Sequence, residues 1–167
     1  PKVMHEIAGL PLLGHALATA SSLGASFVVP VVRHQKEVIA PYIEAFYPNA
    51  KIAEQDEIPG TGRAVECALD AIPADFKGAV VVTSGDVPLL DVSTLESLID
   101  AHLNAGAAAT ILTAILDDPA GYGRVVRTSD GSFLKIVEDR DTSKKQLDIR
   151  EVNAGVYVFD AQHLRTA

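Results

Sequence analysis

The sequence predicts an α/β fold whose sheet is mostly parallel, with a smaller antiparallel portion. Segments of strand character alternate with segments of helical periodicity as far as residue 115, which is the pattern of α/β proteins. Residues 80–82 are consecutive valines, and such a run is typical of a strand buried on both faces of a parallel sheet. Beyond residue 115, strand-like segments follow one another with little helix between them, which indicates the antiparallel portion.

Helices and strands alternate in the first part of the chain. The expected elements are a helix at 13–23, a strand at 27–32, a helix at 38–46, a strand at 51–54 and a helix at 62–72. The first helix carries apolar residues at intervals of three and four, and Gly24 is placed to end it. Pro30 weakens the strand at 27–32, because proline cannot donate to a strand ladder.

After the valine run, one helix is followed by strands alone. The expected elements are a helix at 93–104 and strands at 107–115, 124–127, 133–137 and 152–159. Ser93 and Glu96 have the spacing of a capping box, and the helix is expected to end near Gly106. Residues 139–150 are dense in charge and lack apolar periodicity, which predicts an exposed, flexible loop.

Length, net charge and cysteine content limit the partners and the compartment that the protein can have. The 167 residues allow one domain, and a net charge of −8 argues against a nucleic-acid or anionic-membrane partner. Cys67 is the only cysteine, so no internal disulfide can form, which fits a reducing compartment. No apolar run is long enough to span a bilayer, and no signal-peptide layout opens the sequence. We therefore expect a cytoplasmic protein without membrane insertion.

Several common catalytic motifs are absent from the sequence. The five histidines do not pair with one another, with cysteine or with acids at zinc-motif spacing, which argues against a structural zinc site. There is no G-x-S-x-G elbow, no Walker A loop and no G-x-G-x-x-G fingerprint. Hydrolase, ATPase and dehydrogenase functions therefore have little support.

Asp86 is the first candidate functional residue. It follows the valine run after Gly85, and ligands of open α/β sheets bind beyond the carboxyl ends of strands. Magnesium is often held by only one or two carboxylates, with phosphate and water as the other ligands. Asp86 is thus placed to hold Mg²⁺ against the phosphates of a nucleotide. The plain interpretation is a turn, because Gly-Asp and Asp-x-Pro are ordinary loop sequences.

Other segments also admit a functional and a plain interpretation. Residues 60–62, Gly-Thr-Gly, allow close approach of backbone to a ligand at a helix N-terminus, or Thr61 simply caps that helix. Residues 121–123 form either a ligand-facing loop or only a turn. Glu138 ends a strand, where an acid ordinarily faces solvent. Asparagine is depleted in strands, so Asn153 requires a specific partner, which the backbone alone could supply.

In their order and spacing, these motifs resemble the sugar-nucleotide pyrophosphorylases. The segments that carry the resemblance are Pro1-Lys2-Val3, Gln55 with Gly60-Thr61-Gly62, residues 84–89, residues 121–124, Glu138 and residues 151–157. Within that family they are most similar to the uridyltransferase domain of bifunctional bacterial enzymes that also carry an acetyltransferase domain. The resemblance covers essentially the whole chain and implies a Rossmann-like nucleotidyltransferase fold.

The resemblance also implies roles for individual residues. Lys2 would bind phosphate and Asp86 would bind Mg²⁺, and these two would be the catalytic residues. The segment that reads uracil would comprise Gln55, Gly60 and Thr61. The residues that bind the sugar would be Gly123, Glu138 and Asn153.

The implied reaction joins UTP and N-acetylglucosamine 1-phosphate into UDP-N-acetylglucosamine and pyrophosphate, for synthesis of cell-wall precursors. A sugar-phosphate oxygen would attack the α-phosphorus of UTP in line. Such a transfer needs positioning and charge neutralisation more than covalent help from the protein. This requirement fits a sequence that offers no obvious nucleophile or general base.

The sequence departs from the family pattern in places. The Gly-rich signature loop and the strand that carries it would lie upstream of Pro1, and an asparagine that shares the metal would lie beyond Ala167. We therefore expect residues 1–167 to be an incomplete nucleotidyltransferase domain, and we expect trimer formation through a C-terminal domain outside them. Arg63 stands where the family often has histidine, with little expected consequence.

Two alternative functions remain open from the sequence. One is a nucleotidyltransferase that uses another sugar phosphate or another base. The other is a nucleotide-binding module without activity, which becomes the better interpretation if the natural protein begins at Pro1.

Overall fold

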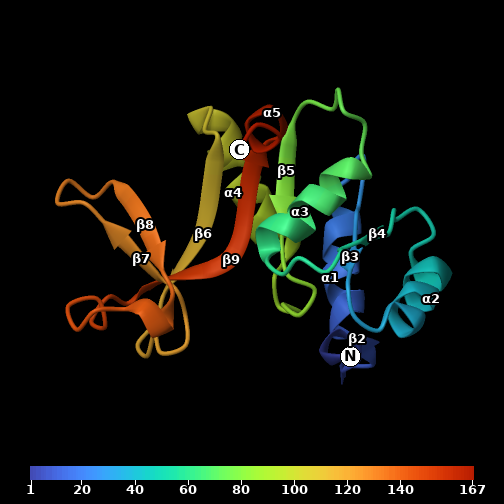
Figure 1. Ribbon diagram of the computed structural model, residues 1–167, viewed down its shortest axis with the longest axis horizontal. Coiled ribbons are helices and arrows are strands. Elements are labelled where there is room, and N and C mark those ends of the chain that lie inside the picture. The colour runs from blue at the N-terminus through green and yellow to red at the C-terminus, as the bar shows by residue number, and fades with distance from the viewer.

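The computed structural model describes residues 1–167 as helices packed around three sheets (Figure 1). The first half contains η1 (Lys2–Met4), β1 (Glu6–Ile7), β2 (Leu10–Pro11), α1 (Leu12–Ser22), β3 (Val31–Val32), α2 (Lys36–Phe46), β4 (Ala53–Glu54), α3 (Thr61–Asp70) and β5 (Ala79–Val82). The second half contains α4 (Val92–Ala105), β6 (Ala109–Ile115), β7 (Arg124–Arg127), β8 (Phe133–Val137), η2 (Asp139–Asp141), β9 (Glu151–Asp160) and α5 (Ala161–Leu164).

The N-terminal part is built on α1, α2 and a parallel pair of short strands. β3 and β4 pair in parallel, with Val31 opposite Ala53, while β1 and β2 form a small antiparallel hairpin. One cluster of buried side chains joins α1, β3 and α2: Leu13, Leu17, Val32, Ile39 and Ile43. These contacts explain why the apolar residues of both helices recur at helical spacing.

The C-terminal part is a five-stranded sheet organised by β9. β5 and β6 both pair with β9, and the β7–β8 hairpin joins the same strand through Arg124 opposite Val152. α4 covers this sheet, and a second buried cluster consists of Leu95, Leu98, Val156 and Val158. In Figure 1 the β7–β8 hairpin extends away from the rest of the molecule, on the side opposite α2.

The predicted α/β, Rossmann-like fold is confirmed, but parallel pairing is rarer than predicted. Only β3 and β4 pair in parallel, and every pair in the five-stranded sheet is antiparallel. The reason is that β9 runs beside both β5 and β6 in the opposite direction. The apolar valines of β5 therefore lie beside an antiparallel neighbour.

Most of the predicted elements are present, with shifted ends. The strand expected at 27–32 is reduced to Val31–Val32, and Asp91 rather than Ser93 caps α4 by accepting from Thr94 N at 2.7 Å. Gly106 ends α4 with a φ of 56°, as predicted. A short 3₁₀ turn, η2, opens the charged segment at 139–150. No helix of the structure is both long and apolar enough to cross a membrane.

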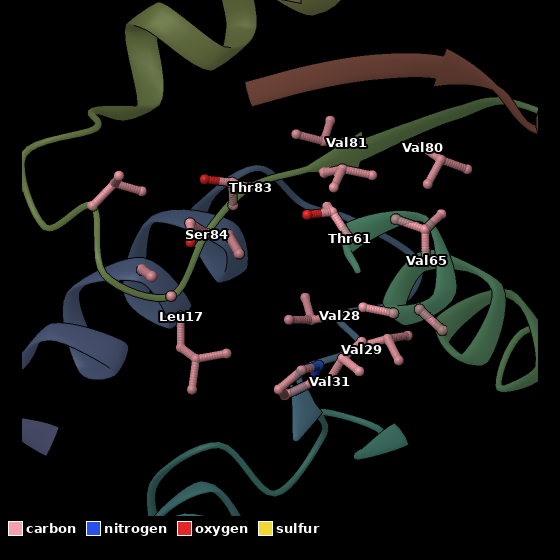
Figure 2. A pocket seen from close by; sticks show the side chains of 18 of the residues that line it. Leu17, Val28, Val29, Val31, Thr61, Val65, Val80, Val81, Thr83 and Ser84 are labelled. Carbon is pink, nitrogen blue, oxygen red and sulfur yellow. The ribbon is translucent and has the colours of Figure 1, made fainter. Parts of the chain in front are cut away.

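A cavity of about 1280 Å³ lies between β3 and β5 and separates the two clusters (Figure 2). β3 pairs only with β4 and β5 pairs only with β9, so each presents one unpaired edge. Figure 2 shows apolar side chains lining the space, Val28 and Val29 from one side and Val80 and Val81 from the other. Thr83 also lines it, and its buried hydroxyl has no hydrogen-bond partner.

These features favour an extended segment as the occupant of the cavity. Two unpaired strand edges and an apolar lining match what a β-strand buried between neighbours requires. We propose that a strand upstream of residue 1 fills the cavity, in accord with the expectation from the sequence.

Residues 1–167 alone should therefore unfold with low cooperativity and expose apolar surface. Adding the natural upstream strand should sharpen the thermal transition and reduce binding of the dye ANS. The control is an upstream extension of equal length and composition with scrambled order. A transition for residues 1–167 as sharp as that of the extended protein would contradict the proposal.

Candidate functional site

Lys2 and Asp86 form the first part of the site. Asp86 lies in the loop that follows β5, and Lys2 belongs to η1. The Lys2 Nζ atom is 2.7 Å from Asp86 Oδ2, with 76% of the lysine side chain and 27% of the aspartate side chain exposed. The hydrogen bond from Lys2 lowers the pKa of Asp86 below its ordinary value, and a bond from Ser84 adds to this effect. The same pair raises the pKa of Lys2. Both side chains are thus held in their charged forms.

Asp86 does not belong to a larger cluster of potential metal ligands. The structure contains no group of three or more histidine, cysteine, aspartate or glutamate residues that could hold a metal ion. One carboxylate beside a lysine suits Mg²⁺, whose remaining ligands are commonly water and substrate phosphate. It does not suit zinc, which takes three or four protein ligands.

The second part of the site is the loop at 55–60, which leads into α3. The side-chain amide of Gln55 donates to Ile58 O at 2.8 Å and to Gly60 O at 3.1 Å. Gly60 has a φ of +119°, a conformation that other residues rarely adopt. Thr61 is the first residue of α3 and makes no capping bond. The structure therefore places Gly60, not Thr61, at the N-cap position of α3.

The third part brings together residues from three segments. Asn153 N donates to Gly123 O at 2.8 Å, which ties the start of β9 to the loop before β7. A Cβ atom on Gly123 would lie 3.0 Å from Ile136 Cγ2, 3.6 Å from Glu138 Oε1 and 3.8 Å from Asn153 Cβ. A side chain at 123 would therefore crowd Ile136. The structure thus brings Gly123, Glu138 and Asn153 together, and the shared role that the resemblance implies for them stays a prediction.

Asn153 has the specific partners that its position in a strand requires. Its Oδ1 atom accepts from Gly155 N at 3.0 Å, and its Nδ2 atom donates to the hydroxyl of Tyr157 at 2.6 Å. Tyr157 lines the cavity and was not singled out from the sequence. The only available signal was its place in the same short motif, four residues after Asn153.

Arg124 is a second residue that the sequence analysis missed. It is only 2% exposed, pairs with Asp139 at 3.0 Å and donates to Tyr122 O. A buried guanidinium requires such partners, because an unpaired buried charge is strongly destabilising. Arg124 therefore links the loop before Gly123 to the segment after Glu138.

The cavity connects most of these groups. The predicted site residues on its lining are Lys2, Gln55, Gly60, Thr61, Glu138 and Asn153. Asp86 and Gly123 lie outside the lining, although Asp86 contacts Lys2 and Gly123 contacts Glu138. The structure thus places charged, amide and main-chain groups on the lining of the cavity that the proposed upstream strand would enter.

Comparison with known proteins identifies a family and several relatives. Residues 1–130 match the family model described as the MobA-like NTP transferase domain. The chain is 58% identical over 165 residues to the bifunctional protein GlmU of Clavibacter sepedonicus, and 53% identical to that of Leifsonia xyli subsp. xyli. Each alignment covers 99% of this chain and 34% of the relative. The chain therefore spans about a third of the length of these curated relatives.

Solved structures share the fold at low sequence identity. HddC from Yersinia pseudotuberculosis superposes with a TM-score of 0.73 and 22% identity, covering all of this chain and 70% of that one. A CMP:2-keto-3-deoxy-manno-octonic acid synthetase in complex with CTP gives a TM-score of 0.74 and 19% identity, covering 99% of this chain and 69% of that one. These likenesses establish the fold.

Replacing Lys2 with methionine should raise the pKa of Asp86 toward its ordinary value of 3.8. The pKa of Asp86 is lowered in the folded protein, so the pair stabilises the fold above about pH 3.8 and loses this effect as pH falls through the lower, folded-state pKa. A carboxyl ¹³C NMR titration measures the change. Asp91 serves as the control, because its pKa is lowered by Thr94 and Ser93 rather than by Lys2. An unchanged pKa of Asp86 in Lys2→Met would contradict this interpretation.

Proposed function

Because the chain belongs to the MobA-like NTP transferase domain family, we propose that it transfers a uridylyl group from UTP to N-acetylglucosamine 1-phosphate. The products are UDP-N-acetylglucosamine, a precursor for the cell wall, and pyrophosphate. The observation that carries the proposal is the contact between Lys2 and Asp86 in the loop after β5. Two further polar groups accompany it: the loop at 55–60 and the cluster of Gly123, Glu138 and Asn153. The high identity to bifunctional GlmU proteins supports the choice of this sugar and base.

Lys2 and Asp86 serve the phosphates in this proposal. Lys2 Nζ is largely exposed and can move from Asp86 to a phosphate oxygen, where it acts as a point charge. Asp86 would hold Mg²⁺, which offsets negative charge on the phosphates when it is bound. Asp86 would thus have a cationic partner both without substrate, when Lys2 contacts it, and with substrate, when Mg²⁺ would replace the lysine.

The two other groups position the organic parts of the substrates. Gln55, Gly60 and Thr61 would contact the uracil, since main-chain groups and an amide can read the edge of a base. Gly123, Glu138 and Asn153 would contact the N-acetylhexosamine. Gly123 lets Glu138 and Asn153 approach each other closely, and Glu138 Oε1 would serve there as a hydrogen-bond acceptor for a sugar hydroxyl.

The reaction is a single displacement at phosphorus. An oxygen of the sugar phosphate forms a bond to the α-phosphorus of UTP, and the bond from that phosphorus to the bridging oxygen breaks. Pyrophosphate leaves with the electron pair. The residues supply orientation and charge, which is the main need of phosphoryl-type transfers. We propose a cytoplasmic enzyme that acts on small phosphorylated substrates and assembles as a trimer through a further domain.

Asp86→Asn in the full-length enzyme should keep the fold and lose Mg²⁺-dependent turnover. Loss of a carboxylate that holds a metal ion can cost several kcal/mol of transition-state stabilisation, and steady-state kinetics across a magnesium series measures the loss. Asp117→Asn is a matched control, since its side chain is fully exposed and pairs only with Arg150. Near-normal activity of Asp86→Asn with unchanged magnesium dependence would overturn the assignment.

Glu138→Ala and Asn153→Ala should weaken use of the sugar phosphate more than use of UTP. Each substitution would remove a hydrogen-bonding group that we assign to the sugar, and loss of such a contact weakens binding of that substrate alone. Varying each substrate in turn shows which KM changes, and the KM for UTP is the internal control. A rise in the KM for UTP alone would mean that the two halves of the site are reversed.

A further inference from the structure

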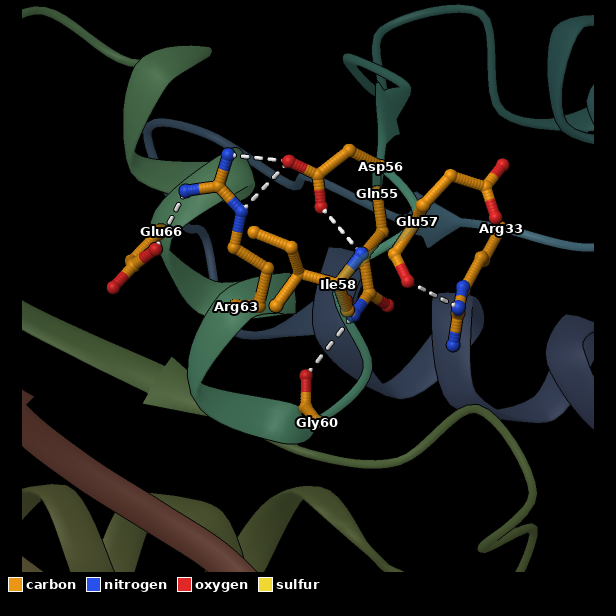
Figure 3. A network of polar contacts seen from close by, with 8 residues as sticks. All are labelled: Arg33, Gln55, Asp56, Glu57, Ile58, Gly60, Arg63 and Glu66. Carbon is orange, nitrogen blue, oxygen red and sulfur yellow. Dashed lines mark hydrogen bonds and ion pairs between the residues drawn. The ribbon is translucent and has the colours of Figure 1, made fainter.

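The loop at 55–60 is braced by a network of charged side chains (Figure 3). Arg63, in the first turn of α3, donates to Asp56 Oδ2 through Nε at 3.0 Å and through Nη2 at 2.6 Å. Its third nitrogen, Nη1, donates to Glu66 Oε2 at 2.6 Å. Arg33 donates to Glu57 O at 2.8 Å from the side of β3. The loop is thus held from both of its flanks.

One path in this network leads directly from Arg63 to Gln55. Asp56 accepts from Arg63 through Oδ2 and from Ile58 N, at 3.1 Å, through Oδ1. The carbonyl of the same residue, Ile58, accepts from the side chain of Gln55. Figure 3 shows these groups in sequence, from the guanidinium to the Gln55 amide. Displacement of Asp56 would therefore release both the main chain of Ile58 and the side chain of Gln55.

The position of Arg63 is unfavourable unless it is paired. A cation in the first turn of a helix opposes the helix dipole. Asp56 and Glu66 both offset this charge, and the hydrogen bond from Arg63 lowers the pKa of Asp56 so that it stays ionised. The side chain is 32% exposed, so the network lies at the surface but is partly shielded. Two N–H groups of Arg63 donate to one oxygen of Asp56, which restricts the loop more than the single ammonium of a lysine at this position would.

Gln55 is the residue whose orientation depends on this bracing. Both hydrogens of its side-chain amide are directed to carbonyls of the loop, at Ile58 and Gly60. This leaves Oε1 as the group that Gln55 can offer to a base, and Gln55 lines the cavity. An acceptor in a fixed orientation opposite N3 favours uracil, which has an N–H donor at that position, over cytosine, which has an acceptor there.

We infer that Arg63 is a positioning residue for the nucleotide: through Asp56 and Ile58 it holds the Gln55 side chain in the orientation that selects the base. This inference rests on the proposed function, in which the loop at 55–60 contacts uracil. The residue does not itself touch the substrate. Its effect is confined to the nucleotide side of the site, because Gly123, Glu138 and Asn153 belong to other segments.

The test uses the full-length enzyme and compares Arg63→Ala, Asp56→Asn, Arg63→Lys and Glu66→Gln with wild type. The KM for UTP, the KM for N-acetylglucosamine 1-phosphate and the preference for UTP over CTP are measured together with the Tm. Glu66→Gln is the matched control, since it removes a partner of Arg63 on the side away from the loop and leaves the contact with Asp56 intact.

Arg63→Ala and Asp56→Asn should each raise the KM for UTP about fivefold. A fivefold change corresponds to roughly 1 kcal/mol, which is the contribution of one partly exposed ion pair. Both should lower the preference for UTP over CTP and leave the KM for the sugar phosphate unchanged. Arg63→Lys should recover part of the loss, and Glu66→Gln should behave as wild type.

Different results would overturn the positioning role of Arg63 and the proposed function. An unchanged KM for UTP and an unchanged base preference would overturn the positioning role, as would a parallel rise of both KM values with a large fall in Tm. If Arg63→Ala fails to fold, Asp56→Asn decides, because it leaves the sequence of α3 intact. If wild type does not turn over UTP at all, the proposed function fails, and the inference about Arg63 falls with it.

Discussion

The unpaired edges of β3 and β5 divide the interior of the protein and leave buried main-chain groups without partners. Backbone N–H and C=O groups require partners when they are buried, and each of these strands has a partner on one side only. The space between them divides the apolar interior into one cluster on α1 and α2 and another on α4 and β9. Helix α1 spans the division, with Thr19 donating to Leu90 O at 3.2 Å and Leu23 packed against the second cluster.

The site residues are distributed around this division. Lys2 and the loop at 55–60 come from the N-terminal part, whereas Glu138 and Asn153 come from the antiparallel part of the molecule. Asp86 follows β5 and meets Lys2 across the boundary. A substrate with a nucleotide at one end and a sugar at the other would therefore contact both parts. The relative placement of the two clusters of apolar residues then controls the distance between the two halves of the site.

The polar groups of the site are held by different physical means. Around the loop at 55–60, a partly shielded surface network of Arg63, Asp56 and Arg33 braces a loop that has no apolar core of its own. Around Gly123, the buried Arg124 and close packing restrict the backbone. Salt weakens the ion pairs around the loop at 55–60, and a substitution there easily alters them. The guanidinium of Arg124, by contrast, is protected from solvent.

Hydrophobic spacing and turn residues are local properties, so they predicted the α/β class and the periodic helices, whereas the roles of the site residues were implied by the family resemblance and stay predictions. The sequence predicted the strands at 124–127 and 133–137 with their observed bounds. It did not predict that the strand at 27–32 would be reduced to Val31–Val32, or that β5 would lie beside an antiparallel neighbour. Strand pairing depends on partners far away along the chain. For the same reason only the tertiary structure placed Lys2 on Asp86, Tyr157 on Asn153 and Arg63 on Asp56.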